Sequence, residues 1–197
     1  MCRLLLGSYK GIKLYHKRYD ITNLLSHLER ELGGNGNGLV LIKDNIIKFY
    51  KKGVKYHVNE IGKTLIREEY DYAIFHTRLA SIGEVIDSNC HPYVYENTCL
   101  SMNGTIIELA EEAINRNITD TEIIFESVKN LELSNTINIL KSFNSCSFIG
   151  CVNGTPYVIR GSHTIYKWNS KHTLFASTFP VRIKASPLTK NQIWIGG

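Results

Sequence analysis

The chain has 197 residues, of which 43% are hydrophobic and 21% charged, and its formal net charge is +5. This length suffices for one well-buried core, and the composition is that of a globular chain rather than a disordered one. Lysines and arginines are scattered, with only short pairs such as Lys17-Arg18, which argues against a nucleic-acid partner. Apolar runs are too short for a signal peptide or a membrane span, so we expect no membrane association and a cytoplasmic location.

The chain contains five cysteines, an odd number without the paired spacing of a disulfide framework. Cys90-His91 has no neighbouring pair at ligand spacing, and Cys146 and Cys151 do not form a two-residue knuckle, which argues against zinc. We therefore expect Cys90, Cys99, Cys146 and Cys151 to form no disulfide and to bind no metal.

Short apolar runs bounded by Gly and Asn alternate with stretches of helical periodicity. In chain order, the first half predicts a strand at 2–6, a helix at Ile21–Leu32, a hairpin of Gly38–Lys43 and Ile46–Tyr50 around Asp44-Asn45, and strands at Tyr72–Thr77 and Thr98–Met102. Tyr72–Thr77 is almost continuously apolar, which is typical of a central strand.

The second half predicts helices followed by strands. The expected helices are Ile106–Asn115, Glu122–Leu131 and Thr136–Phe143, and the expected strands are Phe148–Val152, Tyr157–Arg160, Leu174–Ala176 and Ile193–Ile195. The pattern of strands, helices and strands again, without a repeat or a linker, predicts one α+β domain with sheets and helices in layers.

Cys2 is the first candidate catalytic residue in the chain. Cysteine is small enough for Met1 to be removed, which would place a free α-amine and a thiol on one residue. The amine, with a reference pKa of about 7.7–8.0, could then accept the thiol proton as the base of a nucleophile–base pair. The alternative is a buried cysteine that packs in a strand.

Arg78 lies in the run His76-Thr77-Arg78-Leu79-Ala80-Ser81-Ile82-Gly83, at the C-terminal end of a buried strand. A charge in that position needs a partner. The partner could be a substrate carboxylate held by the guanidinium fork, or an internal Asp or Glu in a structural ion pair.

Two further segments offer groups for recognition or catalysis. Asn103-Gly104 is typical of a tight turn, although an Asn amide and a Gly backbone N–H can also converge on an oxyanion. Thr119 and Glu122 have the spacing of a capping box, and Asp120 between them could instead pair with a substrate ammonium. The glycine-rich segment 33–38 follows a helix and precedes a strand, the wrong order for a dinucleotide fingerprint, and is interpreted as a flexible turn near a ligand.

Taken in order, these segments resemble the class II (type 2) glutamine amidotransferases of the N-terminal-nucleophile hydrolase superfamily. The resemblance rests on Met-Cys-Arg-Leu, His-Thr-Arg-Leu-Ala-Ser-Ile-Gly, Asn-Cys-His-Pro-Tyr, Asn-Gly and Thr-Asp-Thr-Glu, with a weaker likeness at Phe-Ala-Ser near residue 176. It looks closest to small stand-alone members, a group that includes an amidohydrolase of ergothioneine biosynthesis.

The resemblance implies a four-layer αββα fold over residues 1–197, with no cofactor. Cys2 would be the nucleophile and its own amine the base, Arg78 would bind the α-carboxylate of glutamine, and Asp120 its α-ammonium. Asn103 and Gly104 would form the oxyanion hole. His76, Ser81 and His91 lie in segments of the family pattern and are interpreted as support for the pocket.

The implied activity is glutaminase chemistry through a γ-glutamyl thioester, with ammonia released for a separate synthase partner. Met102 stands where many members have His, which changes pocket polarity rather than the assignment. Two alternatives remain open: hydrolysis of another γ-glutamyl or small amide on the same fold, and a catalytically silent domain that binds glutamine or regulates a partner.

Overall fold

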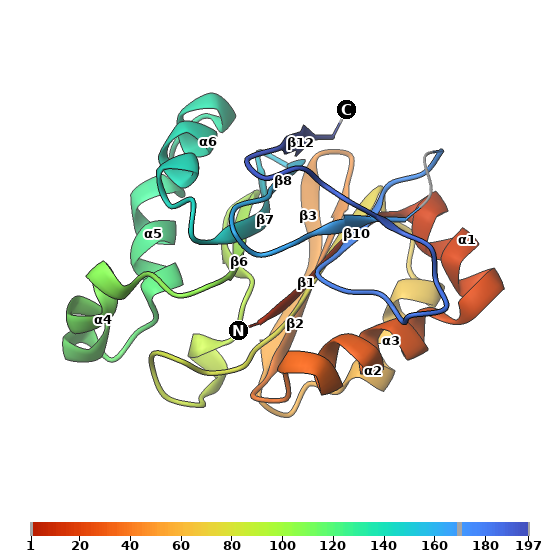
Figure 1. Cartoon of the computed structure of the whole chain (residues 1–197), viewed down its shortest axis with the longest axis horizontal. Coiled ribbons are helices and arrows are strands. Elements are labelled where there is room, and N and C mark those ends of the chain that lie inside the picture. Colours follow the sequence, from red (N-terminus) through yellow and green to blue (C-terminus); the bar gives the residue numbers. More distant parts are fainter. Residues whose placement is uncertain (1, 169–170, 197) are drawn as a thin grey trace.

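The computed structural model describes residues 2–168 and 171–196, which form two antiparallel sheets, one of seven strands and one of five. The sheets lie face to face, and helices cover the outer face of each (Figure 1). The four layers are therefore αββα, as the family resemblance implied.

The first sheet has β1 near its centre, between β10 and β4. Its strands, in spatial order, are β11 (Ser186–Pro187), β9 (Tyr166–Lys167), β10 (Leu174–Ala176), β1 (Arg3–Ser8), β4 (Tyr72–Thr77), β2 (Asn37–Lys43) and β3 (Ile46–Gly53). The second sheet contains β12 (Ile193–Ile195), β8 (Thr155–Ile159), β7 (Ser147–Val152), β6 (Thr98–Asn103) and β5 (Tyr93–Tyr95), in that order.

The helices divide between the two outer layers. The layer on the first sheet contains α1 (Tyr9–Tyr19), α2 (Ile21–Leu32) and α3 (Val58–Arg67), and the layer on the second contains α4 (Ala110–Arg116), α5 (Asp120–Val128) and α6 (Leu133–Ser142). Short 3₁₀ turns occur at Asp87–Asn89 and Ile107–Leu109. No helix in the described part of the chain is long and apolar enough to cross a membrane.

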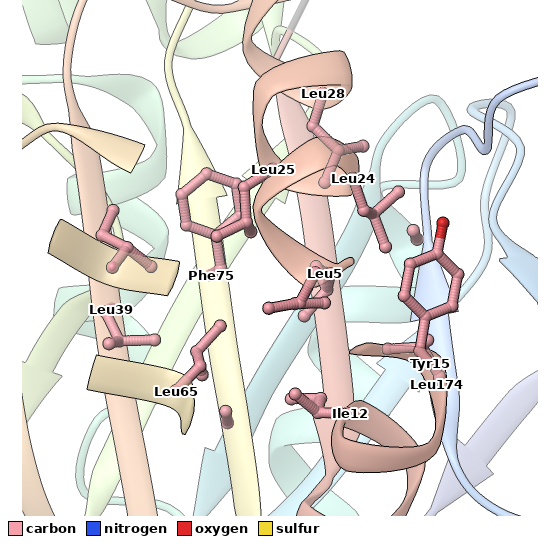
Figure 2. Packing of buried hydrophobic residues seen from close by; sticks show 14 of the residues in the cluster. Leu5, Ile12, Tyr15, Leu24, Leu25, Leu28, Leu39, Leu65, Phe75 and Leu174 are labelled. Carbon is pink, nitrogen blue, oxygen red and sulfur yellow. The ribbon is translucent and has the colours of Figure 1, made fainter. Parts of the chain in front are cut away.

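The sequence of β1 is almost continuously apolar because the strand is buried on both faces. Leu5 points toward α1 and α2 and joins the core beneath these helices (Figure 2). Leu4 and Leu6 point the other way, into the core between the two sheets. Because successive side chains of a strand alternate between faces, a strand buried on both faces needs apolar residues at every position. By the same alternation Cys2 lies on the side of the second sheet.

The predicted strands and hairpin are confirmed with small shifts in their ends. Asp44 and Asn45 form the hairpin turn, each with positive φ (52° and 59°), a conformation that Asp and Asn tolerate. Ile106–Asn115 is a 3₁₀ turn followed by α4, and the next two helices begin two or three residues earlier than predicted. Helices α1 and α3 were not predicted.

The five cysteines are free thiols in the structure. Cys99 and Cys151 face each other across β6 and β7, with their sulfurs 3.2 Å apart. A disulfide has an S–S distance of about 2.05 Å, so the two sulfurs are in contact without being bonded.

Candidate active site

Cys2 lies directly before β1 and is 7% exposed. Its thiol donates a hydrogen bond to the backbone carbonyl of Leu79 at 3.7 Å. In the antiparallel pair of β1 and β4, Arg3 lies opposite Thr77, so the same register places Cys2 opposite Arg78. The start of β1 therefore meets the C-terminal end of β4, where the His-Thr-Arg motif is located.

Arg78 is 2% exposed, and its guanidinium holds the loop that follows β4. It donates hydrogen bonds to the carbonyl oxygens of Glu84 (2.6 Å), Ile82 (2.8 Å) and Gly83 (3.0 Å). Within the described chain it forms no ion pair with Asp or Glu. The structural ion pair considered from the sequence is thus replaced by three backbone carbonyls. A guanidinium has five N–H groups, so two are left beyond these three bonds.

The glycine-rich segment 33–38 runs alongside Arg78. The N–H of Arg78 donates to Gly36 O at 2.8 Å, and the N–H of Asn35 donates to Arg78 O at 2.9 Å. The Asn35 side chain also accepts the N–H of Ala80 at 3.0 Å. Gly36 has φ +127°, and a Cβ there would lie 2.3 Å from the Cys90 sulfur, so only glycine fits. The glycine-rich segment therefore contacts the end of β4 and helps to hold Arg78 in place.

Asn103 is the last residue of β6, and Gly104 follows it; β6 and β7 are strands of the second sheet that pack against β1. Asn103 is buried, and its Oδ1 has no hydrogen-bond partner among the described residues. Gly104 has φ +141°, and a Cβ there would lie 2.5 Å from the sulfur of Cys146. The turn considered from the sequence is present, and both its conformation and this close contact require glycine.

Asp120 is buried at the start of α5, after Thr119, whose hydroxyl caps the helix by accepting the N–H of Glu122 at 3.1 Å. Asp120 accepts two other backbone N–H groups, from Ile106 at 2.8 Å and from Thr121 at 2.9 Å. Burial raises the pKa of the Asp120 carboxyl above its ordinary value, and the backbone hydrogen bonds oppose this rise.

The charges of Arg78 and Asp120 both act on the Cys2 thiol. Burial is the largest influence and raises the pKa of that thiol; Arg78 lowers it and Asp120 raises it further. The two charged residues therefore have opposite effects on the pKa of the Cys2 thiol. Their roles toward a substrate stay predictions.

Comparison with known proteins found no matching family model and no matching curated protein. Among solved structures, glutamine phosphoribosylpyrophosphate amidotransferase from B. subtilis, complexed with ADP and GMP, aligns with a TM-score of 0.67 and 18% identity over 99% of this chain and 47% of that one. A second structure, of the allosteric regulatory enzyme of purine biosynthesis, aligns with a TM-score of 0.61 and 17% identity over 90% of this chain and 42% of that one.

A glutamine aminotransferase class-II domain protein from Silicibacter pomeroyi aligns with a TM-score of 0.53 and 12% identity over 99% of this chain and 94% of that one. The fold is that of the N-terminal-nucleophile hydrolases. The chain spans about half the length of the first two structures, and at these identities the likeness concerns the fold. In this fold Cys2 lies directly before the start of β1.

A buried pair of histidines comes from β4 and from the segment just before β5. The rings of His76 and His91 are 4.3 Å apart between centroids, and their four nitrogens make no hydrogen bond with any described residue. Burial lowers the pKa of His76 to about 3, with the nearby backbone of Met102 acting in the opposite direction, and lowers the pKa of His91 well below its ordinary value. Both rings are therefore neutral near pH 7.

The hydroxyl of Ser101 and Oδ1 of Asn103, on β6 of the second sheet, are likewise buried without a partner in the described chain. Buried polar atoms in proteins normally bind ordered water or ligand when they lack protein partners. The motifs around His76 and His91 marked these histidines as pocket support. Nothing in the sequence indicated Ser101 as a site residue, apart from its position two residues before Asn103.

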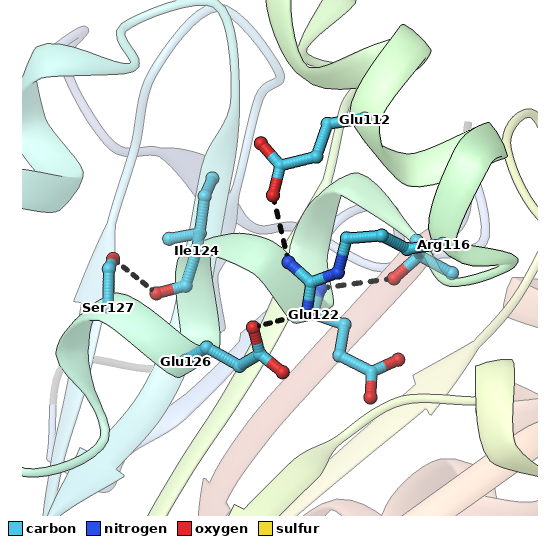
Figure 3. A network of polar contacts seen from close by, with 7 residues as sticks. Glu112, Arg116, Glu122, Ile124, Glu126 and Ser127 are labelled. Carbon is cyan, nitrogen blue, oxygen red and sulfur yellow. Dashed lines mark hydrogen bonds and ion pairs between the residues drawn. The ribbon is translucent and has the colours of Figure 1, made fainter.

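Arg116 is the last residue of α4, in the segment between Gly104 and Asp120. Its guanidinium pairs with Glu112 on α4 (2.8 Å) and with Glu126 on α5 (2.6 Å), as Figure 3 shows. Because these groups are exposed, the pairs contribute at most about 1 kcal/mol each. The pair with Glu126 joins α4 to α5, whereas the pair with Glu112 lies within α4.

Proposed function

We propose that the chain is a glutamine amidotransferase that hydrolyses the side-chain amide of glutamine, with Cys2 as its nucleophile. The observation that carries the proposal is the position of the Cys2 thiol directly before β1, where it donates a hydrogen bond to the carbonyl of Leu79, the residue next to the buried cation Arg78. The buried anion Asp120 also affects the pKa of this thiol. A zwitterionic amino-acid head group needs one fixed charge of each sign. The likeness in fold to glutamine amidotransferases supports the same substrate.

Substrate binding uses the two charged residues. Arg78 binds the α-carboxylate through the two N–H groups that the loop carbonyls leave over. Each oxygen of Asp120 accepts one backbone N–H and keeps a further lone pair for the α-ammonium group. The amide end of glutamine then extends toward Cys2.

Catalysis begins once Met1 has been removed, since the amine of Cys2 is then the base. This amine takes the thiol proton, and the sulfur attacks the amide carbon, forming a C–S bond and a tetrahedral oxyanion. The side-chain N–H of Asn103 and the backbone N–H of Gly104 stabilise the oxyanion. The C–N bond then breaks, and ammonia leaves with the proton from the amine.

The remaining γ-glutamyl thioester is hydrolysed by water, which restores the Cys2 thiol and gives glutamate. Because burial raises the pKa of this thiol, the thiolate is scarce at rest, and the thiol gives its proton to the amine as the sulfur attacks. The ammonia passes to a separate synthase partner.

The test is the intact mass of the protein after incubation with a diazo-ketone analogue of glutamine. We expect a polypeptide that lacks Met1 and carries one adduct, on Cys2. Cys2→Ala keeps a small second residue, so Met1 is still removed, but the adduct and ammonia release are lost while glutamine binding persists. The control Cys99→Ala, in the core between the sheets, keeps both. An adduct that persists in Cys2→Ala would falsify the assignment of the nucleophile, and retention of Met1 would point to a silent domain.

A further inference from the structure

Two buried cysteines of the second sheet lie face to face. Cys99 on β6 and Cys151 on β7 are directly opposite each other in the register of these antiparallel strands, and both are 0% exposed. Their Sγ atoms are 3.2 Å apart. The sulfurs of Cys2, Cys90 and Cys146 contact oxygen atoms instead. The fold therefore brings together one particular pair of thiols.

The geometry of the pair suits a bond between the two strands. Directly opposite residues of antiparallel strands have Cα atoms about 4.5–5.5 Å apart, and this separation lies within the range of about 4.4–6.8 Å that a disulfide spans. Rotation of the two side chains can therefore bring the sulfurs from contact into a bond while the strands stay paired. Two facing cysteines can also pack simply as small apolar residues, and oxidation of the folded protein separates the two roles.

The pair lies close to a place where hairpin turns of both sheets meet. The Cys151 thiol donates to Asn97 O at 3.4 Å, in the turn between β5 and β6. The N–H of Gly154, in the turn between β7 and β8, donates to the same oxygen at 2.8 Å. A Cβ at Gly154 would lie 2.0 Å from Asn45 O, in the turn between β2 and β3. Because Asn97 is partly exposed, the Cys151 thiol lies directly beneath a turn that solvent reaches.

Burial makes oxidation of this pair slow, and a short edge hairpin gives it a route. Burial raises the pKa of the Cys99 thiol well above its ordinary value, and a neutral thiol is a poor nucleophile. The strand that flanks Cys99 is β5, an edge strand of only three residues in which Val94 lies opposite Cys99. Short edge elements open locally at a lower free energy than central strands. Opening of the β5–β6 turn therefore admits a small oxidant to the thiols while the rest of the sheet stays folded.

We propose that Cys99 and Cys151 are a redox-sensitive pair, which hydrogen peroxide converts into a disulfide between β6 and β7. The thiolate of Cys151 attacks a peroxide oxygen, the O–O bond breaks, and the leaving hydroxide takes up a proton to become water, which gives a sulfenic acid. The thiol of Cys99 then attacks this sulfur, and the S–O bond breaks with release of a second water. Two thiols and one hydrogen peroxide thus give one disulfide and two molecules of water, and the two electrons that the sulfurs lose reduce the peroxide.

The bond closes a covalent loop over residues 99–151, which contains α4, α5 and α6. A cross-link of this kind restricts the unfolded chain, so the oxidised protein resists unfolding more strongly than the reduced one. In the structure both thiols are reduced, and the proposal concerns the oxidised protein. Nothing in this inference depends on glutamine hydrolysis.

The test is incubation of the folded, reduced wild type with a small excess of hydrogen peroxide. The remaining thiols are then blocked, and the protein is digested and mapped without reductant. We expect one cross-linked pair of peptides, joined at Cys99 and Cys151, that dithiothreitol separates. Cys99→Ala and Cys151→Ala should each lose the link. Cys146→Ala, a neighbouring thiol on the same segment, should keep it, and so should Cys2→Ala, which removes the proposed nucleophile.

The oxidised wild type should unfold at a urea midpoint about 1 M or more above that of the reduced protein, and dithiothreitol should restore the lower midpoint. Cys151→Ala should show no midpoint shift on oxidation. A link that is absent from the folded protein, that joins other cysteines, or that forms only in unfolding concentrations of urea overturns the pair. Equal midpoints of the linked and reduced proteins overturn the stabilising effect.

If an alanine variant does not fold, the peptide map and the urea midpoints of the wild type still decide the question. Because no readout uses glutamine or ammonia, failure here is separable from failure of the proposed glutaminase function.

Discussion

The carboxylate of Asp120 accepts the backbone N–H of Ile106 at 2.8 Å and so ties the start of α5 to the segment just after Gly104. Its other oxygen accepts the N–H of Thr121 at 2.9 Å. The residue proposed to bind the substrate ammonium therefore also holds the turn proposed to stabilise the oxyanion, and a change at Asp120 should affect both stability and substrate binding.

Asp120→Asn should lower the free energy of unfolding by about 1–3 kcal/mol, because the amide has one acceptor oxygen and its NH₂ faces one of the two N–H donors. The half-saturation concentration for glutamine should rise as the anion is lost. Urea unfolding and steady-state ammonia release measure the two effects. Glu126→Gln, which breaks an exposed pair with Arg116, should cost at most about 1 kcal/mol and leave glutamine saturation unchanged. Equal behaviour of the two variants would refute the role of Asp120.

Arg78→Lys keeps the positive charge but loses the planar fork that reaches Ile82, Gly83 and Glu84. Carboxylate binding should weaken by about 1–3 kcal/mol, raising half-saturation by about five- to 150-fold, with some loss of turnover. Amide hydrogen exchange of residues 79–86 should also accelerate, since three of their carbonyl contacts are lost.

Ammonia release over a wide glutamine range, with exchange measured in parallel, separates the two effects of the Arg78 change. Arg67→Lys, at an exposed pair with Glu68, is the control and should alter neither. If both kinetic constants of Arg78→Lys equal those of the wild type, the substrate carboxylate is not bound by Arg78 and the orientation of glutamine proposed above is wrong.

The sequence predicted β1 and β4 well because strands buried on both faces need uninterrupted apolar residues. Helix α1 escaped prediction because Gly11 interrupts it and most of its residues are polar or aromatic, with only Gly11, Ile12 and Tyr15 buried. Helix α3 carried a usable signal, since its buried Val58, Ile61 and Leu65 have helical spacing.

The candidate site was likewise predictable only in part: its residues could be named from the sequence, but their contacts could not. The sequence indicated Arg78 because a charge at the end of a buried strand needs a partner, and Asp120 because it stands at a helix start where it could pair with a substrate ammonium. Both residues are buried. Which partners they have was not predictable, because Arg78 binds carbonyls of its own loop and Asp120 binds the N–H of Ile106, fourteen residues earlier. Such contacts depend on loop conformations that local sequence does not determine. The contact of Gly104 with Cys146 depends in the same way on the packing of two distant segments.

Gly104→Ala should be more destabilising than Gly34→Ala, although both glycines have positive φ (+141° and +94°). At Gly34 a Cβ meets nothing within 4 Å, so this variant measures backbone strain alone, of about 1–3 kcal/mol. At Gly104 the contact with Cys146 should add about 1–3 kcal/mol. Urea unfolding compares the two, and Gly104→Ala combined with Cys146→Ala should recover part of the difference, because the Sγ contact is removed. Equal losses at both glycines would contradict the close packing of Gly104.

The buried His76–His91 pair should make the fold sensitive to acid. The pKa of His76 is lowered to about 3 in the folded protein, against about 6.5 in the unfolded chain, and that of His91 is lowered in the same direction. Below pH 6.5 the unfolded state therefore binds more protons than the folded state. The stability associated with each neutral ring is fully present above about pH 6.5 and is lost as the pH falls toward 3, by about 1.4 kcal/mol per pH unit for each histidine.

His76→Gln removes one of these two groups and keeps a neutral polar side chain between the sheets. Whatever its stability at pH 7.5, the fall in its free energy of unfolding between pH 6 and pH 4 should be shallower than in the wild type by about 1.4 kcal/mol per pH unit. Urea unfolding at several pH values measures this slope. His57→Gln, at an exposed histidine before α3, should keep the wild-type slope. An unchanged slope in His76→Gln would mean that His76 becomes protonated without unfolding, and hence that water or a ligand in the layer between the sheets stabilises its charged form.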